Sequence, residues 1–155
     1  SGKLPVTFYR SDADLPDFED YNMRGRTYRY FQGEALYPFG HGLSYTTFAV
    51  GRPVYKDGKV TVEVANTGSL AGDEVVQIYI RRVDDIAGPQ KSLRAFRRVS
   101  LLPGEKKRVV IDMPRESFTC WDEATRSMRV VPGSSLLMAG SSSADLSAPV
   151  AVKIK

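Results

Sequence analysis

The residues best suited to chemistry lie near the amino end, where closely spaced carboxylates precede arginines and a histidine. Segment 11–20 carries Asp12, Asp14, Asp17, Glu19 and Asp20. Such carboxylates could coordinate calcium, but a loop counted from Asp12 lacks the glycine and the distal glutamate of an EF-hand. Asp and Ser side chains also satisfy backbone amides in turns and helix caps. We therefore predict turn and cap roles for this segment rather than a metal site.

Three arginines, Arg24, Arg26 and Arg29, follow the carboxylates and are interspersed with aromatic residues. One interpretation is a cationic binding patch. The other is that the guanidinium groups pair with the upstream carboxylates and stack on Tyr28 or Tyr30. We favour the second interpretation, because it gives each group a partner close in the sequence.

The remaining candidates for chemistry are His41, which lies between two glycines, and Cys120, the single cysteine. The sequence identifies no metal co-ligand or triad partner for His41, so we predict a structural hydrogen-bonding role for it. One cysteine excludes an internal disulfide framework and a Cys-based metal site. A nucleophile, a base and an orienting acid cannot be assembled into a recognisable series, which argues against a self-sufficient enzyme.

These residues are positioned by a stretch dense in aromatic residues and glycine, here called the strap and defined as residues 26–46. Each of its aromatic rings hides about 150–250 Å² when it is buried. Pro38, Gly40 and Gly42 disfavour a helix through its middle. We expect an extended, turning strap with its rings inserted between two bodies. The interface candidates are Arg26, Tyr28, Tyr30, Phe31, Tyr37, Phe39 and His41.

After the strap the pattern becomes that of short β-strands. Residues 59–65 alternate strictly, which predicts that Val60, Val62 and Val64 face a core. Asp57-Gly58 supplies the positive φ that a tight hairpin needs. Residues 118–131 predict a second hairpin, turned around 122–125. The other expected strands are 46–50, 73–80, 92–102, 107–113, 135–139 and 149–154.

Short strands separated by regularly spaced turns predict an all-β fold, an immunoglobulin-like β-sandwich over residues 44–155. The 155 residues, 42% of them hydrophobic, suffice for a core. The net charge of +4 is spread over small clusters such as Arg81-Arg82 and Arg97-Arg98. We interpret these clusters as solvated strand faces and protected sheet edges, and no motif indicates nucleic-acid binding. The sequence shows neither an apolar run long enough for a transmembrane helix nor a signal peptide.

Several motifs, in this order, resemble one family. RTYRYF at 26–31 and YPFGHGLSYT at 37–46 are similar to the end of the catalytic portion of glycoside hydrolase family 3, the β-glucosidase and β-xylosidase family. The later sequence resembles that family's C-terminal fibronectin type III-like domain. The motifs that carry this second likeness are VANTG at 64–68, AGDEVVQIY at 71–79, LLPGE at 101–105, Trp121-Asp122 and Pro132-Gly133. The resemblance covers nearly the whole chain.

The resemblance also implies which parts the chain lacks. Family 3 enzymes are retaining glycosidases in which a barrel supplies an Asp nucleophile and an α/β sandwich domain commonly supplies the acid/base. By this likeness, residues 1–43 are the tail of the α/β sandwich domain with its linker strap. Retaining chemistry needs two carboxyl groups about 5–5.5 Å apart. No family motif marks the acid pairs Asp73-Glu74 or Asp84-Asp85 as catalytic, so we expect the chain alone to be inactive.

Two functions compete at this stage. The first is a non-catalytic accessory domain that packs on the catalytic domains of a β-glucosidase or β-xylosidase and stabilises them. The alternative is a carbohydrate-binding module with exposed aromatic platforms, for which Trp121, Tyr79 and Tyr55 are the candidates. For Trp121 we favour a core or half-buried ring, because a large indole is usually well buried. The resemblance implies no cofactor and a periplasmic or secreted location.

Overall fold

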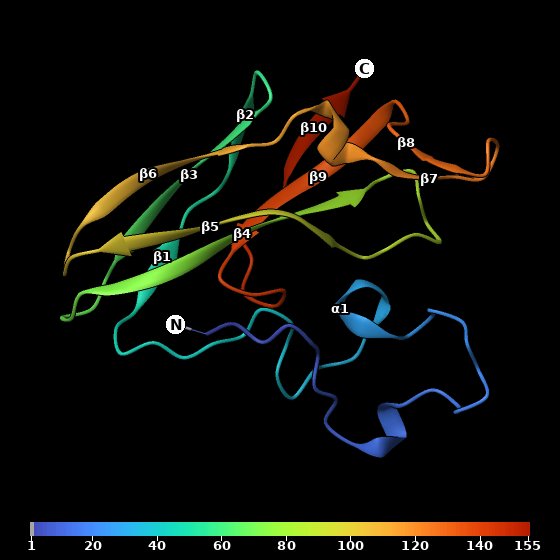
Figure 1. Ribbon diagram of the computed structural model, residues 1–155, viewed down its shortest axis with the longest axis horizontal. Coiled ribbons are helices and arrows are strands. Elements are labelled where there is room, and N and C mark those ends of the chain that lie inside the picture. The colour runs from blue at the N-terminus through green and yellow to red at the C-terminus, as the bar shows by residue number, and fades with distance from the viewer. Residues whose placement is uncertain (1) are drawn as a thin grey trace.

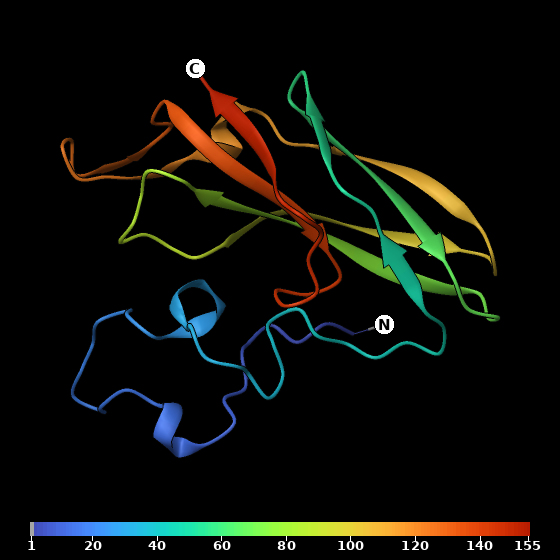
Figure 2. The same ribbon diagram turned by 180° about the vertical axis from the view of Figure 1, so that it is seen from behind.

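Two antiparallel sheets packed face to face form the main body of the computed structural model, which describes residues 2–155 (Figure 1). The N-terminal segment, here residues 2–45, runs along one side of this sandwich in both views (Figure 2). The strands are β1 (Phe48–Val50), β2 (Val54–Lys56), β3 (Lys59–Asn66), β4 (Gly72–Arg82), β5 (Ser92–Leu101), β6 (Lys106–Asp112), β7 (Cys120–Asp122), β8 (Ser127–Arg129), β9 (Gly133–Gly140) and β10 (Val150–Ile154). The helical turns are η1 (Asp12–Asp14), α1 (Thr27–Tyr30) and η2 (Arg115–Phe118).

Strand β3 is the centre of the first sheet. β6 pairs with one of its edges, and β1 and β2 share the other. Val60, Val62 and Val64 are buried, which confirms the prediction from alternation. The β2–β3 hairpin turns through Asp57 at φ 50° and Gly58 at φ 72°, which confirms the predicted tight turn.

Strand β4 is central in the second sheet, whose order is β10–β9–β4–β5. It pairs with β5 on one side and β9 on the other, as its long apolar run predicts. Val76, Ile78 and Leu137 from this sheet meet the valines of β3 in one core. The other predicted strands and the 118–131 hairpin, seen as β7 and β8, are also present. The all-β sandwich expectation is therefore confirmed.

The strap differs from the expectation at one place. Thr27–Tyr30 form one helical turn, α1, closed by the Phe31 amide donating to the Thr27 carbonyl over 2.9 Å. The prediction of an extended segment is wrong for these four residues. The reason is local, because Pro38, Gly40 and Gly42 all lie downstream and do not restrict the backbone before Phe31.

Candidate functional site

The inner side of the strap packs on the sandwich. The Tyr28 ring stacks on Phe39 with centroids 4.2 Å apart and meets Tyr79 of β4 edge-on at 5.9 Å. The Tyr28 hydroxyl accepts a hydrogen bond from the Leu93 amide over 3.1 Å. Of the two bodies expected to flank the strap rings, the structure therefore supplies one: this chain's own second sheet.

A buried polar joint lies beside these rings. The Gln77 side-chain amide donates to the carbonyls of Gly40 and Ser141 over 3.3 and 2.6 Å, and its oxygen accepts from the Tyr79 hydroxyl over 2.5 Å. Gly40 has φ 78°, and a Cβ at this position would collide with the Gln77 side chain. Burial raises the pKa of the Tyr79 hydroxyl well above its ordinary value, so the hydroxyl stays a donor.

A nearly buried ion pair fixes the start of the segment to the same sheet. Lys3 Nζ lies 2.7 Å from Glu74 Oε1, and both side chains are largely withdrawn from solvent. Asp73, which precedes Glu74 on β4, instead forms an ion pair with the exposed Arg98. Adjacent strand residues point to opposite faces. The pair Asp73-Glu74 therefore works as two separate structural contacts.

Other contacts of the strap lie within the N-terminal segment itself and involve Phe31, Tyr30 and Arg26. Phe31 meets Tyr9 edge-on at 4.8 Å, and the Arg29 guanidinium lies 5.8 Å from the Tyr30 ring centroid. This stacking agrees with the favoured interpretation of the arginines. Arg26 donates to the backbone carbonyls of residues 17, 20 and 22, where carboxylate partners were expected. Carbonyls bind it because the acidic side chains are already engaged locally.

Those local bonds are the predicted turn and cap contacts. The Asn22 amide donates to Asp20 Oδ1 over 2.9 Å, and the Glu19 amide to Asp17 Oδ1 over 3.1 Å. The Asn22 bonds hold the pKa of the Asp20 carboxyl below its usual range. Within residues 2–155 no group of three or more potential metal-ligating side chains forms a site.

Many other large apolar side chains of the segment face solvent. Tyr37 pairs edge-on with Phe8 and lies 5.4 Å from the His41 ring, and Tyr37 and Phe8 are about half exposed. Phe18 is 91% exposed, Tyr21 89% and Tyr45 96%. We call the exposed apolar residues of the segment the outer face. It comprises Val6, Phe8, Leu15, Phe18, Tyr21, Met23, Leu36, Tyr37, Leu43 and Tyr45.

The candidate sugar platforms differ in exposure. Tyr79 is fully buried beneath Tyr28, so the proposal of a sugar contact there is wrong. The burial follows because the N-terminal segment, with Tyr28, covers the face of β4 from which the Tyr79 ring projects. Tyr55 packs edge-on against Phe118 at 5.4 Å and is partly buried. Trp121 on β7 is 50% exposed, which fits the half-buried ring that we favoured.

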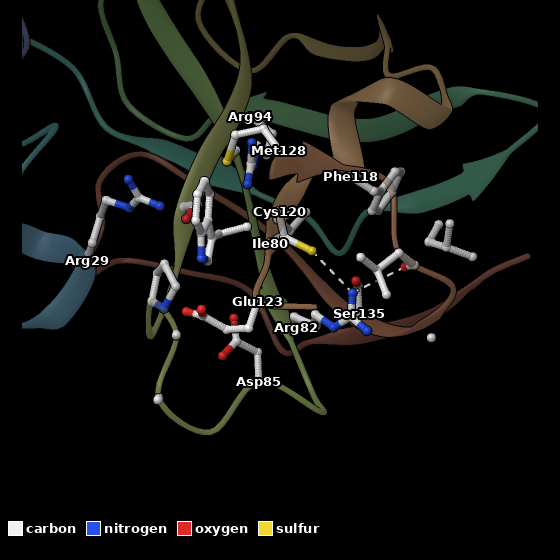
Figure 3. A pocket seen from close by; sticks show the side chains of 18 of the residues that line it. Arg29, Ile80, Arg82, Asp85, Arg94, Phe118, Cys120, Glu123, Met128 and Ser135 are labelled. Carbon is white, nitrogen blue, oxygen red and sulfur yellow. Dashed lines mark hydrogen bonds between the residues drawn. The ribbon is translucent and has the colours of Figure 1, made fainter. Parts of the chain in front are cut away.

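Trp121 lines a cavity of about 440 Å³ between the β7–β8 hairpin, the second sheet and α1 (Figure 3). Three arginines line this cavity: Arg29 of α1, Arg82 of β4 and Arg94 of β5. Two loop residues, Asp85 and Glu123, line it as well. The sequence does not predict that these three arginines converge on one cavity, because they lie on elements far apart along the chain.

The electrostatics of the cavity are unbalanced. None of the ion pairs found among residues 2–155 includes Arg29, Arg82 or Arg94. Burial, and after it the charge of Arg29, lowers the pKa of the Arg94 guanidinium. Arg82 is held by the carbonyls of Val131 and Pro132 and by Cys120 Sγ, 3.2 Å from its Nη1. The cavity lining therefore carries three guanidinium groups against the two carboxylates of Asp85 and Glu123, which is an excess of positive charge.

The sequence and the structure of this chain are similar to those of several known proteins. A family model described as a fibronectin type III-like domain matches residues 74–143. A xylan 1,4-β-xylosidase of Xylanibacter ruminicola is 48% identical over 150 residues, covering 93% of this chain and 17% of that protein. A periplasmic β-glucosidase of Salmonella typhimurium is 39% identical, covering 79% of this chain and 19% of that protein. The structure of DesR, a β-glucosidase from Streptomyces venezuelae in complex with D-glucose, matches with a TM-score of 0.84 at 36% identity, over 99% of this chain and 23% of that one.

The chain belongs to glycoside hydrolase family 3. It corresponds to the C-terminal region of these proteins, including their fibronectin type III-like domain. This chain spans about a fifth of the length of the curated relatives that it matches. Among residues 2–155 no helix is both long and apolar enough to cross a membrane.

Proposed function

We propose that this chain serves as a non-catalytic accessory region of a retaining, exo-acting β-glucosidase or β-xylosidase, where it packs against the catalytic domains and stabilises them. The names of the relatives support this parent activity. In this proposal residues 1–43 are the tail of the α/β sandwich domain with its linker strap, and residues 44–155 are the fibronectin type III-like domain. The periplasmic relative supports a periplasmic or secreted location.

The outer face carries the proposal. Large exposed apolar side chains concentrated in one segment indicate an interaction surface, and Phe18, Tyr21 and Tyr45 are almost fully exposed here. The inner side of the same segment is already occupied by the second sheet. The relatives contain several times more chain than the present 155 residues. We therefore assign the outer face to the rest of the parent protein, which completes the pair of bodies expected around the strap.

The test compares the same substitutions in two contexts. In the 155-residue chain, Leu43→Ser with Tyr45→Ser should change the free energy of unfolding by less than about 0.5 kcal/mol per site, because both side chains are exposed. In the intact family 3 protein they should cost about 1.5–3 kcal/mol for each side chain that docking buries. Thermal unfolding measures both.

Val54→Ser provides the matched control, since Val54 is exposed on the sheet remote from the N-terminal segment (Figure 1). It should have little effect in either context. Equal stability of the intact protein with and without the Leu43/Tyr45 substitutions would contradict the docking proposal. The isolated chain should also bind an apolar fluorescent dye more strongly than the intact protein does.

The second candidate function is carbohydrate binding, and the half-exposed Trp121 beside the cavity favours it. Under this candidate the chain helps the parent enzyme to engage oligo- or polysaccharide. Loss of polysaccharide affinity in Trp121→Ala, measured by affinity electrophoresis, would support it, and the absence of any affinity in the unsubstituted chain would refute it.

A further inference from the structure

The arginine cavity holds more donors than the protein uses. The Nε atoms of Arg29 and Arg94 are both buried and have no hydrogen-bond partner. Arg94 instead donates from Nη2 to the Thr119 carbonyl over 2.8 Å. These Nε atoms are themselves shielded from solvent, but both arginines line the cavity, so a ligand there would bind through their other guanidinium nitrogens.

The excess of guanidinium groups in the lining also favours an anion in this cavity. Guanidinium groups remain charged and favour carboxylate or phosphate in a bidentate geometry. Arg29 and Arg94 each lie near enough that the charge of Arg29 lowers the pKa of Arg94. An anion between them would relieve that repulsion. Two hydrogen bonds join α1, which carries Arg29, to the chain at the start of β5, which carries Arg94. The Gln90 amide, just before β5, donates to the Arg29 carbonyl over 2.6 Å, and the Leu93 amide donates to the Tyr28 hydroxyl.

The rest of the lining is of a different kind. Trp121, Phe118 and Met128 supply apolar surface, and Trp121 leaves half of its ring exposed. In the view of Figure 3, Arg94 lies at the top, whereas Asp85 and Glu123 lie lower, beside Arg82. The Arg94 end is therefore cationic, and the other end, where carboxylates lie beside one guanidinium group, can accept hydrogen bonds from hydroxyl groups.

We propose that this cavity binds a sugar that carries a carboxylate, that is, a uronic acid. The carboxylate lies against Arg94 and Arg29, the apolar face of the ring packs on Trp121, and hydroxyl groups donate to Asp85 and Glu123. This site gives the carbohydrate-binding candidate a defined ligand class, and it is independent of the outer face.

The mixed lining selects this ligand over two simpler ones. A neutral sugar would leave the guanidinium groups that line the cavity without a charged acceptor, which forfeits the strongest available bonds. Free phosphate would satisfy the arginines but would leave the indole face uncovered and bring a multiply charged anion near Asp85 and Glu123. A uronic acid has one charge at one end, which suits Arg94 and Arg29, and hydroxyl groups at the other, which can donate to Asp85 and Glu123 and accept from Arg82.

Isothermal titration of the 155-residue chain tests the proposal with three sugars of nearly the same shape: D-glucuronic acid, its methyl ester and D-glucose. Glucuronate should bind at least about tenfold more tightly than the uncharged sugars, because a charge-assisted hydrogen bond is worth more than a tenfold change in affinity. Its binding should also weaken as salt concentration rises. Equal affinity for all three sugars would overturn the charge requirement while leaving neutral-sugar binding intact.

Arg29→Gln is the variant of choice, since the Arg29 side chain has an unpartnered donor and its removal breaks no ion pair. It should reduce glucuronate affinity by about tenfold or more, while leaving the weak affinity for D-glucose unchanged. Arg108→Gln, at an exposed position on β6, removes the same charge far from the cavity and should leave both affinities unchanged. A matched loss in Arg108→Gln would mean that net charge alone attracts the ligand.

Inorganic phosphate completes the design. It should compete only weakly with glucuronate. If phosphate binds as tightly as glucuronate, or if Trp121→Ala leaves glucuronate affinity unchanged in a chain whose circular dichroism and thermal midpoint match the unsubstituted protein, the site is a general anion site and the proposal is wrong. The absence of glucuronate binding also overturns it, without affecting the docking test on Leu43 and Tyr45.

Discussion

The sandwich and the N-terminal segment are built on opposite plans. The sandwich buries its apolar side chains between two sheets. Strand β3 is central in one sheet and β4 in the other. The N-terminal segment has one helical turn and one 3₁₀ turn, and many of its large apolar side chains face solvent. The sandwich can therefore be explained from its own contacts, whereas the outer face of the segment requires another body.

The joint between the two regions is polar as well as aromatic. Gln77 binds the carbonyl of Gly40, and Lys3 pairs with Glu74. Such buried contacts specify one position of the segment on the sheet, since a shift would leave a buried donor or charge without its partner. The segment is thus held in register although it has almost no regular structure.

The largest expected effect is a matched pair of isoleucine substitutions. Ile78 on β4 is fully buried and Ile86 in the following loop is 91% exposed. Ile78→Ala should lower the free energy of unfolding by about 2–5 kcal/mol, because it removes buried methyl groups and leaves a cavity. Ile86→Ala should change it by less than about 0.5 kcal/mol. Denaturant unfolding followed by circular dichroism measures both, and equal effects would contradict the division between core and surface.

An intermediate effect is expected at the joint. Gly40 and Gly25 both have positive φ, but a Cβ at Gly40 meets Gln77 whereas one at Gly25 meets nothing within 4 Å. Both alanine substitutions should cost about 1–2 kcal/mol for the left-handed backbone. Gly40→Ala should add the loss of the Gln77 contact and speed hydrogen exchange at the Leu4 and Gly40 amides.

Slow exchange in Gly40→Ala, indistinguishable from that in Gly25→Ala, would show that the joint does not hold the segment. Exchange within β3 serves as the internal reference, because β3 belongs to the other sheet and should keep its protection in both variants.

The smallest expected effect is in acid. A hydrogen bond from Ser100, and then one from Arg98, holds the pKa of Asp73 below its ordinary value of 3.8. The contribution of a carboxyl with a lowered folded-state pKa is complete above the unfolded pKa and is lost as the pH falls through the folded pKa. Asp73→Asn should therefore flatten the acid limb of the stability curve for the sandwich.

Asp20 provides the comparison, because its pKa is also lowered but its hydrogen bonds lie within the N-terminal segment. Asp20→Asn should leave the unfolding of the sandwich in acid unchanged. An effect of Asp20→Asn as large as that of Asp73→Asn, in urea titrations between neutral pH and pH 3, would mean that the two regions unfold as one unit.

The sequence predicts the sandwich well because its signals are local and periodic. Alternation identifies Val60, Val62 and Val64 as core, and Asp57-Gly58 identifies the turn before them. It fails for Tyr79, which is as aromatic as a platform residue but is fully buried. Burial of that ring depends on Tyr28, which packs on it from the N-terminal segment, a contact that no local pattern reveals.

The strap and the cavity mark the other limits of sequence reasoning. The density of rings predicts an interface, and the helical turn α1 escapes notice because its four residues are too few to show a helical period. The cavity escapes because Arg29, Arg82 and Arg94 converge only after α1, β4 and β5 have been assembled. Convergent sites of this kind require the tertiary structure.

The position of β4 also has a kinetic consequence. Its partner β5 follows it directly, so that hairpin can form early, whereas pairing of Gln77 with Gly140 of β9 must close a long loop. Non-local pairings slow folding and leave sheet edges exposed while they form. During refolding, the β9-facing edge of β4, with Ile78 and Ile80, remains an unpaired template for other chains. We therefore expect the yield of refolded protein to fall as its concentration rises.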